Sequence, residues 1–225
     1  MRDWLLGAAK AYNRDSYEQR DRYATHLLIP METMRTVIRW SMESIPDEVL
    51  IGFDPDPERP NPDSVEEVFG PSQSSFSGSG FLLGEPHIVN VGDSYSVHHV
   101  PEEWTDGVFS EERGARGSRF ASFLHSHPNA YAHPSQADAE AADWTEGVEM
   151  ILGVRFSPAP LGLEWYDQED GHRRDLKPEE EELPVLARVA GRKVHGFELI
   201  GYLRNGEGVN LLITSAEGFP IGLDL

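Results

Sequence analysis

The chain of 225 residues contains no cysteine. This absence excludes disulfide bonds, thiolate zinc sites and cysteine nucleophiles together. No apolar run approaches the ~18–20 residues that a helix needs to cross a bilayer. The N-terminal stretch MRDWLLGAAKAYNRDSYEQR holds only a short apolar patch that charged residues soon interrupt, unlike a signal peptide. We therefore expect a cytoplasmic protein that does not bind a membrane.

Basic side chains are also scarce, and lysine is the scarcest of them. The chain has 39 acidic and 19 basic residues, a formal net charge of −20, and its only lysines are Lys10, Lys177 and Lys193. Nucleic acid is excluded as an expected partner, because its phosphates require a basic surface. The composition resembles that of salt-in halophiles, above all haloarchaea, where molar salt screens acid–acid repulsion. An acidic protein from a GC-rich genome, with arginine in place of lysine, is the alternative.

The pattern of apolar residues predicts a single α+β domain in which helices flank a mixed β-sheet. The length suffices for one large core. Residues 31–45, METMRTVIRWSMESI, show the three-and-four spacing of a helix with one buried face. Further helices are predicted at 3–25 and 135–147, and strands at 48–53, 81–100, 120–127, 148–156, 161–168 and 196–215.

Two stretches lack this periodicity. Residues 54–80 are rich in proline, serine, glycine and acids, which predicts a long inserted loop. An acidic hinge at 177–184 precedes the last predicted strands. We therefore divide the chain into an N-terminal helical extension (1–26), a main domain (27–176) and C-terminal strands that complete or extend it (177–225).

The most informative stretch is HSHPNAYAHPSQAD, which ends at Asp138. Side chains two apart in a strand point to one face, so His125 and His127 present two imidazoles together. A proline ends that strand, and Ser135 suits the N-cap of a helix with Asp138 at its third position. Two imidazoles and one carboxylate, with a fourth position open for water, match the ligand count of a catalytic zinc site.

A second interpretation of the same stretch needs no metal. Ser135 and Asp138 have the spacing of a capping box, in which the carboxylate accepts the backbone N–H of the N-cap residue. Histidines one residue apart also occur by chance. The zinc site is favoured by the combination of a strand, two histidines, a ten-residue gap and an acid at a helix start.

This combination resembles the JAMM, or MPN-plus, zinc metallopeptidases. Their signature is His-Ser/Thr-His-Pro, six residues, Ser, two residues and Asp, and the chain matches it at every position. The resemblance implies that His125, His127 and Asp138 are the zinc ligands. It also implies that Ser135 hydrogen-bonds to the attacking water or to the developing oxyanion.

The family's remaining catalytic residue is an upstream glutamate that acts as general base. It stands at the start of a strand that follows the first long helix. Glu48 in SIPDEVLIGF fits this place directly after the helix predicted at 31–45. Glu85 in FLLGEPH is the first alternative, and Glu67 in EEVFG is the second, although no helix precedes it. We expect Glu48 to be the base.

The family includes deubiquitinating isopeptidases, archaeal enzymes that remove ubiquitin-like modifiers and bacterial enzymes that trim sulfur-carrier proteins. The resemblance covers residues 27–156 and implies a JAMM/MPN-like catalytic domain at 27–176 with Zn²⁺ as cofactor. It implies hydrolysis of amide or isopeptide bonds at the Gly-Gly tail of ubiquitin-like modifier proteins or their conjugates. Two alternatives remain open: a catalytically silent MPN-type scaffold in a larger complex, and a zinc hydrolase that acts on a small molecule.

Overall fold

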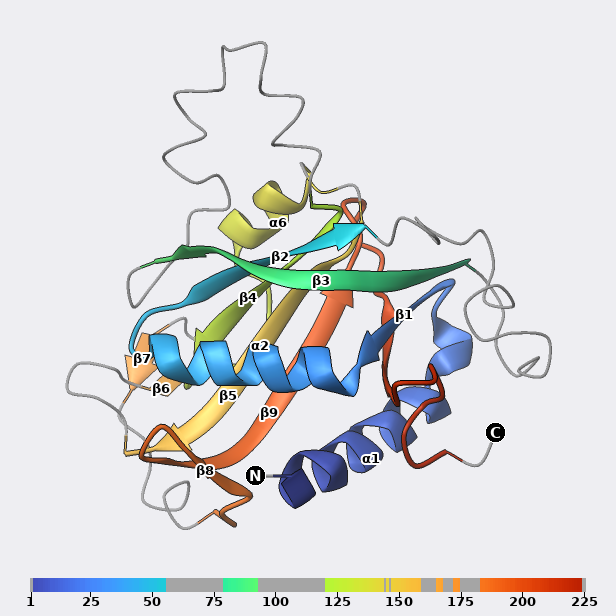
Figure 1. Ribbon diagram of the computed structural model, residues 1–225. Coiled ribbons are helices and arrows are strands. Elements are labelled where there is room, and N and C mark those ends of the chain that lie inside the picture. Colours follow the sequence, from blue (N-terminus) through green and yellow to red (C-terminus); the bar gives the residue numbers. More distant parts are fainter. Residues whose placement is uncertain are drawn as a thin grey trace.

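The computed structural model (Figure 1) describes residues 2–55, 79–92, 120–143, 145, 147–158, 165–167, 172–174 and 183–223. Most of the predicted 54–80 loop and of the 177–184 hinge lies outside the described residues. The described helices are α1 (Arg2–Glu18), α2 (Met31–Ser44) and α6 (Gln136–Ala142), with a 3-10 turn η1 (Arg20–Arg22). The strands are β1 (Thr25–Pro30), β2 (Val49–Pro55), β3 (Ser79–Val91), β4 (Ser122–Pro128), β5 (Glu149–Ser157), β6 (Trp165–Asp167), β7 (His172–Arg174), β8 (Ala187–Val189), β9 (Arg192–Tyr202) and β10 (Asn210–Thr214).

One mixed sheet organises the molecule, with the strand order β10-β1-β3-β2-β4-β5-β9-β8, and β6 and β7 pair separately. β1 runs parallel to β10 and β3, and β4 runs parallel to β5, whereas the other neighbours are antiparallel. The sheet curls until the end of β9 meets the start of β10, where the Val209 N–H donates to the Gly201 carbonyl at 2.8 Å. The predicted α+β fold with a mixed sheet flanked by helices is confirmed.

The pleat of the strands sorts side chains onto two faces, each covered by a different helix. Met150 and Leu152 of β5 belong to the main core, into which α2 also sends its buried residues. Ile151 lies between them and therefore points to the opposite face, where it packs with Ala142 of α6. In Figure 1, α2 crosses the sheet, whereas α6 lies away from α2, near β2 and β4. His125 pairs with Ile151 in register and so lies on the α6 face.

Helix α1 docks against the strands at the seam of the curled sheet. Asn13 donates to the Ile213 carbonyl at 2.7 Å and accepts the Ile213 N–H at 2.8 Å, as a neighbouring strand would. The Tyr12 hydroxyl donates to the Leu199 carbonyl of β9 at 3.0 Å. Parts of all three segments that the sequence suggested thus contribute to one sheet and one core, and their boundaries stay a prediction.

Several elements differ from the expectations. The helix predicted at 3–25 is α1, which ends at Glu18, and η1 and β1 follow it. β1 was not predicted, because its six residues are too few to show a period and a helix begins directly after them. Helix α6 ends at Ala142 rather than at 147. Thr145 has left the helix: its N–H donates to the Ala142 carbonyl at 3.0 Å and its hydroxyl donates to Glu149. None of the described helices has both the length and the apolar character of a transmembrane span.

Candidate metal centre

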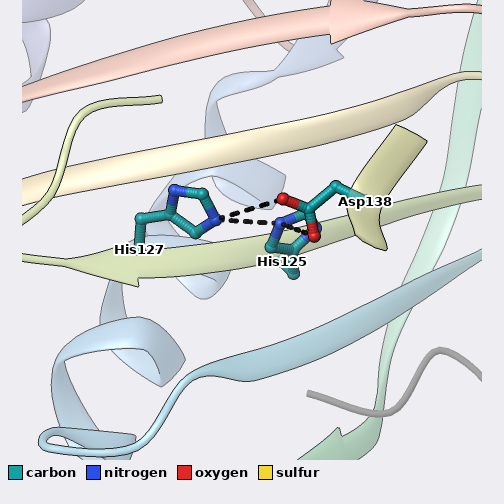
Figure 2. Close-up of side chains that lie close together, drawn as sticks. All are labelled: His125, His127 and Asp138. Atoms are coloured by element: carbon teal, nitrogen blue, oxygen red, sulfur yellow. Dashed lines mark hydrogen bonds and ion pairs between the residues drawn. The ribbon is translucent and has the colours of Figure 1, made fainter. Parts of the chain in front are cut away.

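Strand β4 and the start of α6 bring three ligand-type side chains together (Figure 2). The Nε2 atoms of His125 and His127 lie 3.0 Å apart. One carboxylate oxygen of Asp138 lies 3.2 Å from Nε2 of His125, and the other lies 3.8 Å from Nε2 of His127. One ligand atom from each residue lies within 4.8 Å of the others, and His125 and Asp138 are buried. The histidines and the acid that the signature singled out therefore meet at one point.

Asp138 satisfies both interpretations of the sequence at once. Its Oδ2 accepts the Ser135 N–H at 2.7 Å, and its own N–H donates to Ser135 Oγ at 3.2 Å. This is a complete capping box at the N-terminus of α6. The box holds the carboxylate in place, and Oδ1 faces His125. The capping role is therefore compatible with metal binding, because it positions the candidate ligand.

The loop after β4 fixes the second histidine. Nδ1 of His127 lies 2.9 Å from the Tyr131 carbonyl, to which it can only donate, so Nε2 is the nitrogen whose lone pair is left to bind a metal ion. The loop turns at Asn129, whose φ of 50° suits asparagine and whose side chain accepts the Phe156 N–H at 2.8 Å. It packs so closely on β5 that a Cβ at Gly153 would lie 2.5 Å from a loop carbonyl oxygen.

Glu48 is buried beside the histidines, with 5% of its surface exposed. Leu50 pairs with His125, so the antiparallel register, extended by two residues, places Glu48 across from His127 on the same face. Its charge contributes to the raised pKa of His125. Ser126, between the two histidines, accepts the Val49 N–H at 3.0 Å and so ties the residue after Glu48 to β4. Sequence reasoning missed this role of Ser126.

The alternative bases are placed differently. Glu85 is exposed on β3, which β2 separates from β4. It lies between Leu83 and Pro86, the partners of Pro55 and Phe53, and hence near the far end of β2 from Glu48. Glu67 lies outside the described residues. Of the two described candidates, the structure brings Glu48 and not Glu85 to the histidines.

The charges around the cluster oppose the effect of burial. Burial alone lowers the pKa of His125, but the hydrogen bond and charge of Asp138 and the charges of Glu48 and Glu149 outweigh it and raise that pKa. Burial raises the pKa of Asp138, yet His125 and the hydrogen bonds from Ser135 hold it well below its usual range. The cluster is therefore built to keep positive charge between acids.

A divalent cation fits this donor set. The two imidazole nitrogens lie 3.0 Å apart with a carboxylate beside them. Their lone pairs and the carboxylate repel one another unless a proton or a metal ion lies among them. Two histidines and one carboxylate are also a ligand set found in catalytic zinc proteins. The His125, His127 and Asp138 group can hold a metal ion.

Two hollows lie near the cluster on the α6 side. The larger, about 900 Å³, is lined by α1, α6, β9 and β10 and includes Tyr202, but none of the three candidate ligands lines it. The smaller, about 180 Å³, is lined by Tyr131, Gly153, Arg155 and their neighbours. Because the Tyr131 carbonyl contacts His127 and Gly153 pairs with His127, the smaller hollow adjoins this candidate ligand.

A third buried acid was not singled out from the sequence. Glu149 begins β5, is 1% exposed and interacts electrostatically with His125 and Asp138. The available signal was an acid at the edge of the apolar run VEMILGV, in a strand predicted to be buried.

Comparison with known proteins adds no relative. No protein-family model matches the chain, and no curated protein matches it.

Proposed function

We propose that this protein is a zinc-dependent metallopeptidase of the JAMM type that hydrolyses amide or isopeptide bonds. The observation that carries the proposal is the convergence of His125, His127 and Asp138 on the face where Glu48 is buried. These four residues come from β4, the start of α6 and the residue before β2, and a capping box or a chance histidine pair alone does not require a buried glutamate beside them. The match to the JAMM signature supports the same assignment.

Zinc is the proposed ion because of the donor atoms. Imidazole nitrogens suit zinc and other late transition metals, whereas magnesium and calcium prefer oxygen ligands throughout. Three protein ligands that leave a position open are typical of catalytic zinc rather than of structural zinc. His125, His127 and Asp138 would hold the ion, and its Lewis acidity would make water acidic near neutral pH and polarise a carbonyl group.

The chain's own residues have distinct tasks in the proposed reaction. Glu48 accepts a proton from water while the water oxygen bonds to the carbonyl carbon. The Ser135 hydroxyl accepts the Asp138 N–H, so its own proton is available to donate to the carbonyl oxygen as negative charge develops. Glu48 then passes its proton to the leaving amine as the C–N bond breaks. Ser135 is exposed and Glu48 is buried, which suits contact with the substrate and shielding of the proton, respectively.

The proposed substrates are ubiquitin-like modifier proteins, cleaved after their C-terminal Gly-Gly tail when joined to an amine. This choice of substrate rests on the resemblance to the family. An extended tail can bind by adding a strand to an exposed sheet edge.

A cleavage assay tests the proposal. The substrate is a ubiquitin-like domain with a Gly-Gly tail, joined to a reporter either linearly or through a lysine side chain. Chelator should abolish cleavage and zinc should restore it, at low and at molar KCl. Glu140→Gln, which changes an exposed acid of α6, is the matched control and should cleave like the wild type. A zinc-loaded protein that cleaves neither substrate would overturn the proposal and leave a scaffold or a small-molecule hydrolase.

A further inference from the structure

Glu149 is a buried acid with an incomplete set of hydrogen bonds. The Thr145 hydroxyl donates to Oε1. Within the described residues, Oε2 has no hydrogen-bond partner, although the side chain is 1% exposed. Native structures satisfy nearly all buried polar atoms, so an exception calls for a specific explanation. Glu149 plays no part in the reaction proposed above.

The register places Glu149 on the face of the sheet that carries the metal cluster, diagonal to His125. It pairs with Phe123 of β4 on one side and with Tyr202 of β9 on the other, and so shares the face of His125. His125 is the one cationic group among those that act on its carboxyl, and Asp138 is the other acid. Tyr202 contributes a hydroxyl that is also buried and unpartnered within the described chain.

The two histidines of the cluster differ in how their outer nitrogens are used. His127 already places Nδ1 against the Tyr131 carbonyl at 2.9 Å. Nε2 of His125 faces Asp138 and His127, so Nδ1 is the nitrogen on its other side. Histidine ligands of metals ordinarily donate this second N–H to a carboxylate or a carbonyl, which fixes the tautomer and the ring.

We propose that Glu149 is the outer carboxylate of the metal centre, which orients the His125 ring as a ligand and is itself held in place by Thr145. Two facts carry the inference: the open Oε2 atom, and the position of this acid diagonal to His125 on the shared face. Glu149 is therefore a positioning residue and not a ligand. The inference rests on the metal centre of the proposed function but not on peptide cleavage.

This role predicts that one substitution weakens zinc binding without lowering the stability of the metal-free protein. Glu149→Gln removes a buried charge, so the metal-free protein should melt no lower than the wild type. The same variant should bind zinc ~10–100-fold more weakly, the usual effect of losing an outer-shell partner. A merely structural glutamate would instead lower the melting temperature and leave zinc affinity unchanged.

The experiment measures zinc affinity by competition with a chromophoric chelator at pH 7 for the wild type and three variants. Glu149→Gln should bind more weakly, whereas Glu140→Gln, an exposed acid of α6, should stay within about twofold. Tyr202→Phe should also bind like the wild type, because the phenol is not part of the role. Nitrogen-15 NMR of the zinc-loaded protein should show the His125 ring signals shifted in Glu149→Gln while those of His127 stay in place.

The outcomes separate this inference from the proposed function. If Glu149→Gln binds zinc as tightly as the wild type, the inference is overturned and the proposed function is unaffected. Tyr202→Phe that loses zinc as strongly as Glu149→Gln overturns it too, since the acid would then act through the tyrosine. If Glu149→Gln does not fold, Thr145→Val must weaken zinc binding in the same direction or the inference fails. If the wild type binds zinc but cleaves no peptide, and Glu149→Gln binds zinc more weakly than the wild type, the inference stands and the proposed peptidase activity is overturned. A wild type that binds no zinc removes both.

Discussion

Asp138 acts both as the third residue of a capping box and as a candidate ligand, and two substitutions separate these roles. Asp138→Asn keeps a carbonyl oxygen that can accept the Ser135 N–H, but it removes the anionic ligand. Ser135→Ala removes the oxygen that accepts the Asp138 N–H and leaves all three ligands in place. The first variant should lose zinc with its helix cap intact, and the second should lose the cap and keep zinc.

The expected sizes follow from the linkage between binding and folding. Zinc at one hundred times its Kd stabilises the folded chain by about 2.7 kcal/mol. In a chain of this length, each kcal/mol shifts the melting temperature by ~2–4 °C, so zinc should raise it by ~5–11 °C. A hundredfold loss of affinity at the same zinc concentration leaves about 0.4 kcal/mol, or a shift of ~1–2 °C. Loss of an N-cap costs about 0.5–2 kcal/mol and should lower the melting temperature with or without zinc.

Differential scanning calorimetry with chelator and with added zinc measures both quantities. Wild type and Ser135→Ala should show the same zinc-induced rise from different starting temperatures, whereas Asp138→Asn should show almost none. A full zinc-induced rise in Asp138→Asn would refute the reasoning and leave Asp138 with the cap alone. Loss of the rise in Ser135→Ala would show that the cap, and not the carboxylate charge, holds the ion.

Further predictions concern the proposed base Glu48, the serine that positions its strand, the proton that zinc displaces and the dependence of stability on salt. Glu48→Gln should keep its fold and its zinc yet lose activity by at least ~100-fold, whereas Glu85→Gln should cleave like the wild type; the reverse result in kcat would move the base to β3. Ser126→Ala should lower kcat at unchanged zinc content and Ser126→Thr should restore it, because the hydroxyl holds the strand that follows Glu48. The raised pKa of His125 means that the metal-free protein retains a proton that zinc displaces, so zinc affinity should fall as pH falls through that pKa. Calorimetric titration in two buffers should detect proton release near neutral pH, and a buffer-independent heat would contradict it. The melting temperature of the chelated protein should rise steeply from tens of millimolar to molar KCl, and a flat profile would remove the halophile interpretation.

The elements with a strong local pattern were predictable from the sequence. The helix expected at 31–45 is α2, and the strands expected at 48–53, 120–127 and 148–156 are β2, β4 and β5 within two residues at each end. Their period, their flanking prolines and their apolar runs are all local signals. The same locality made the N-cap at Ser135 readable from the sequence.

The parts that depend on distant contacts were not predictable. β1 lies between β10 and β3 in the sheet, and its pairing with Asn210–Thr214 joins residues that are far apart in the chain. Helix α6 was expected to continue to 147, but the Thr145 hydroxyl is drawn to Glu149 on β5. The two residues are only four apart in the chain, but the contact forms because Glu149 is fixed in the sheet between β4 and β9, which the local pattern does not show.

The same distinction applies within the site. Residues 125–138 predict the ligands because their strand, loop and helix start are contiguous in sequence. Glu48 reaches the ligands only through the β2–β4 register, and Glu149 only through the β4–β5 register. A resemblance to a family could point to Glu48, but only the sheet shows that Glu149 shares a face with His125.

The acids that the structure describes therefore include two groups that respond to different perturbations. The exposed acids repel one another through water, and added salt screens that repulsion because the Debye length falls to about 3 Å at molar concentration. Glu48, Asp138 and Glu149 are buried at 5%, 8% and 1% exposure, where mobile ions do not reach. Their mutual repulsion is relieved by a proton on the histidines or on an acid such as Glu149, whose pKa burial raises, or by a cation among the candidate ligands. Salt and zinc should consequently stabilise the protein independently, because each acts on acids that the other leaves unchanged.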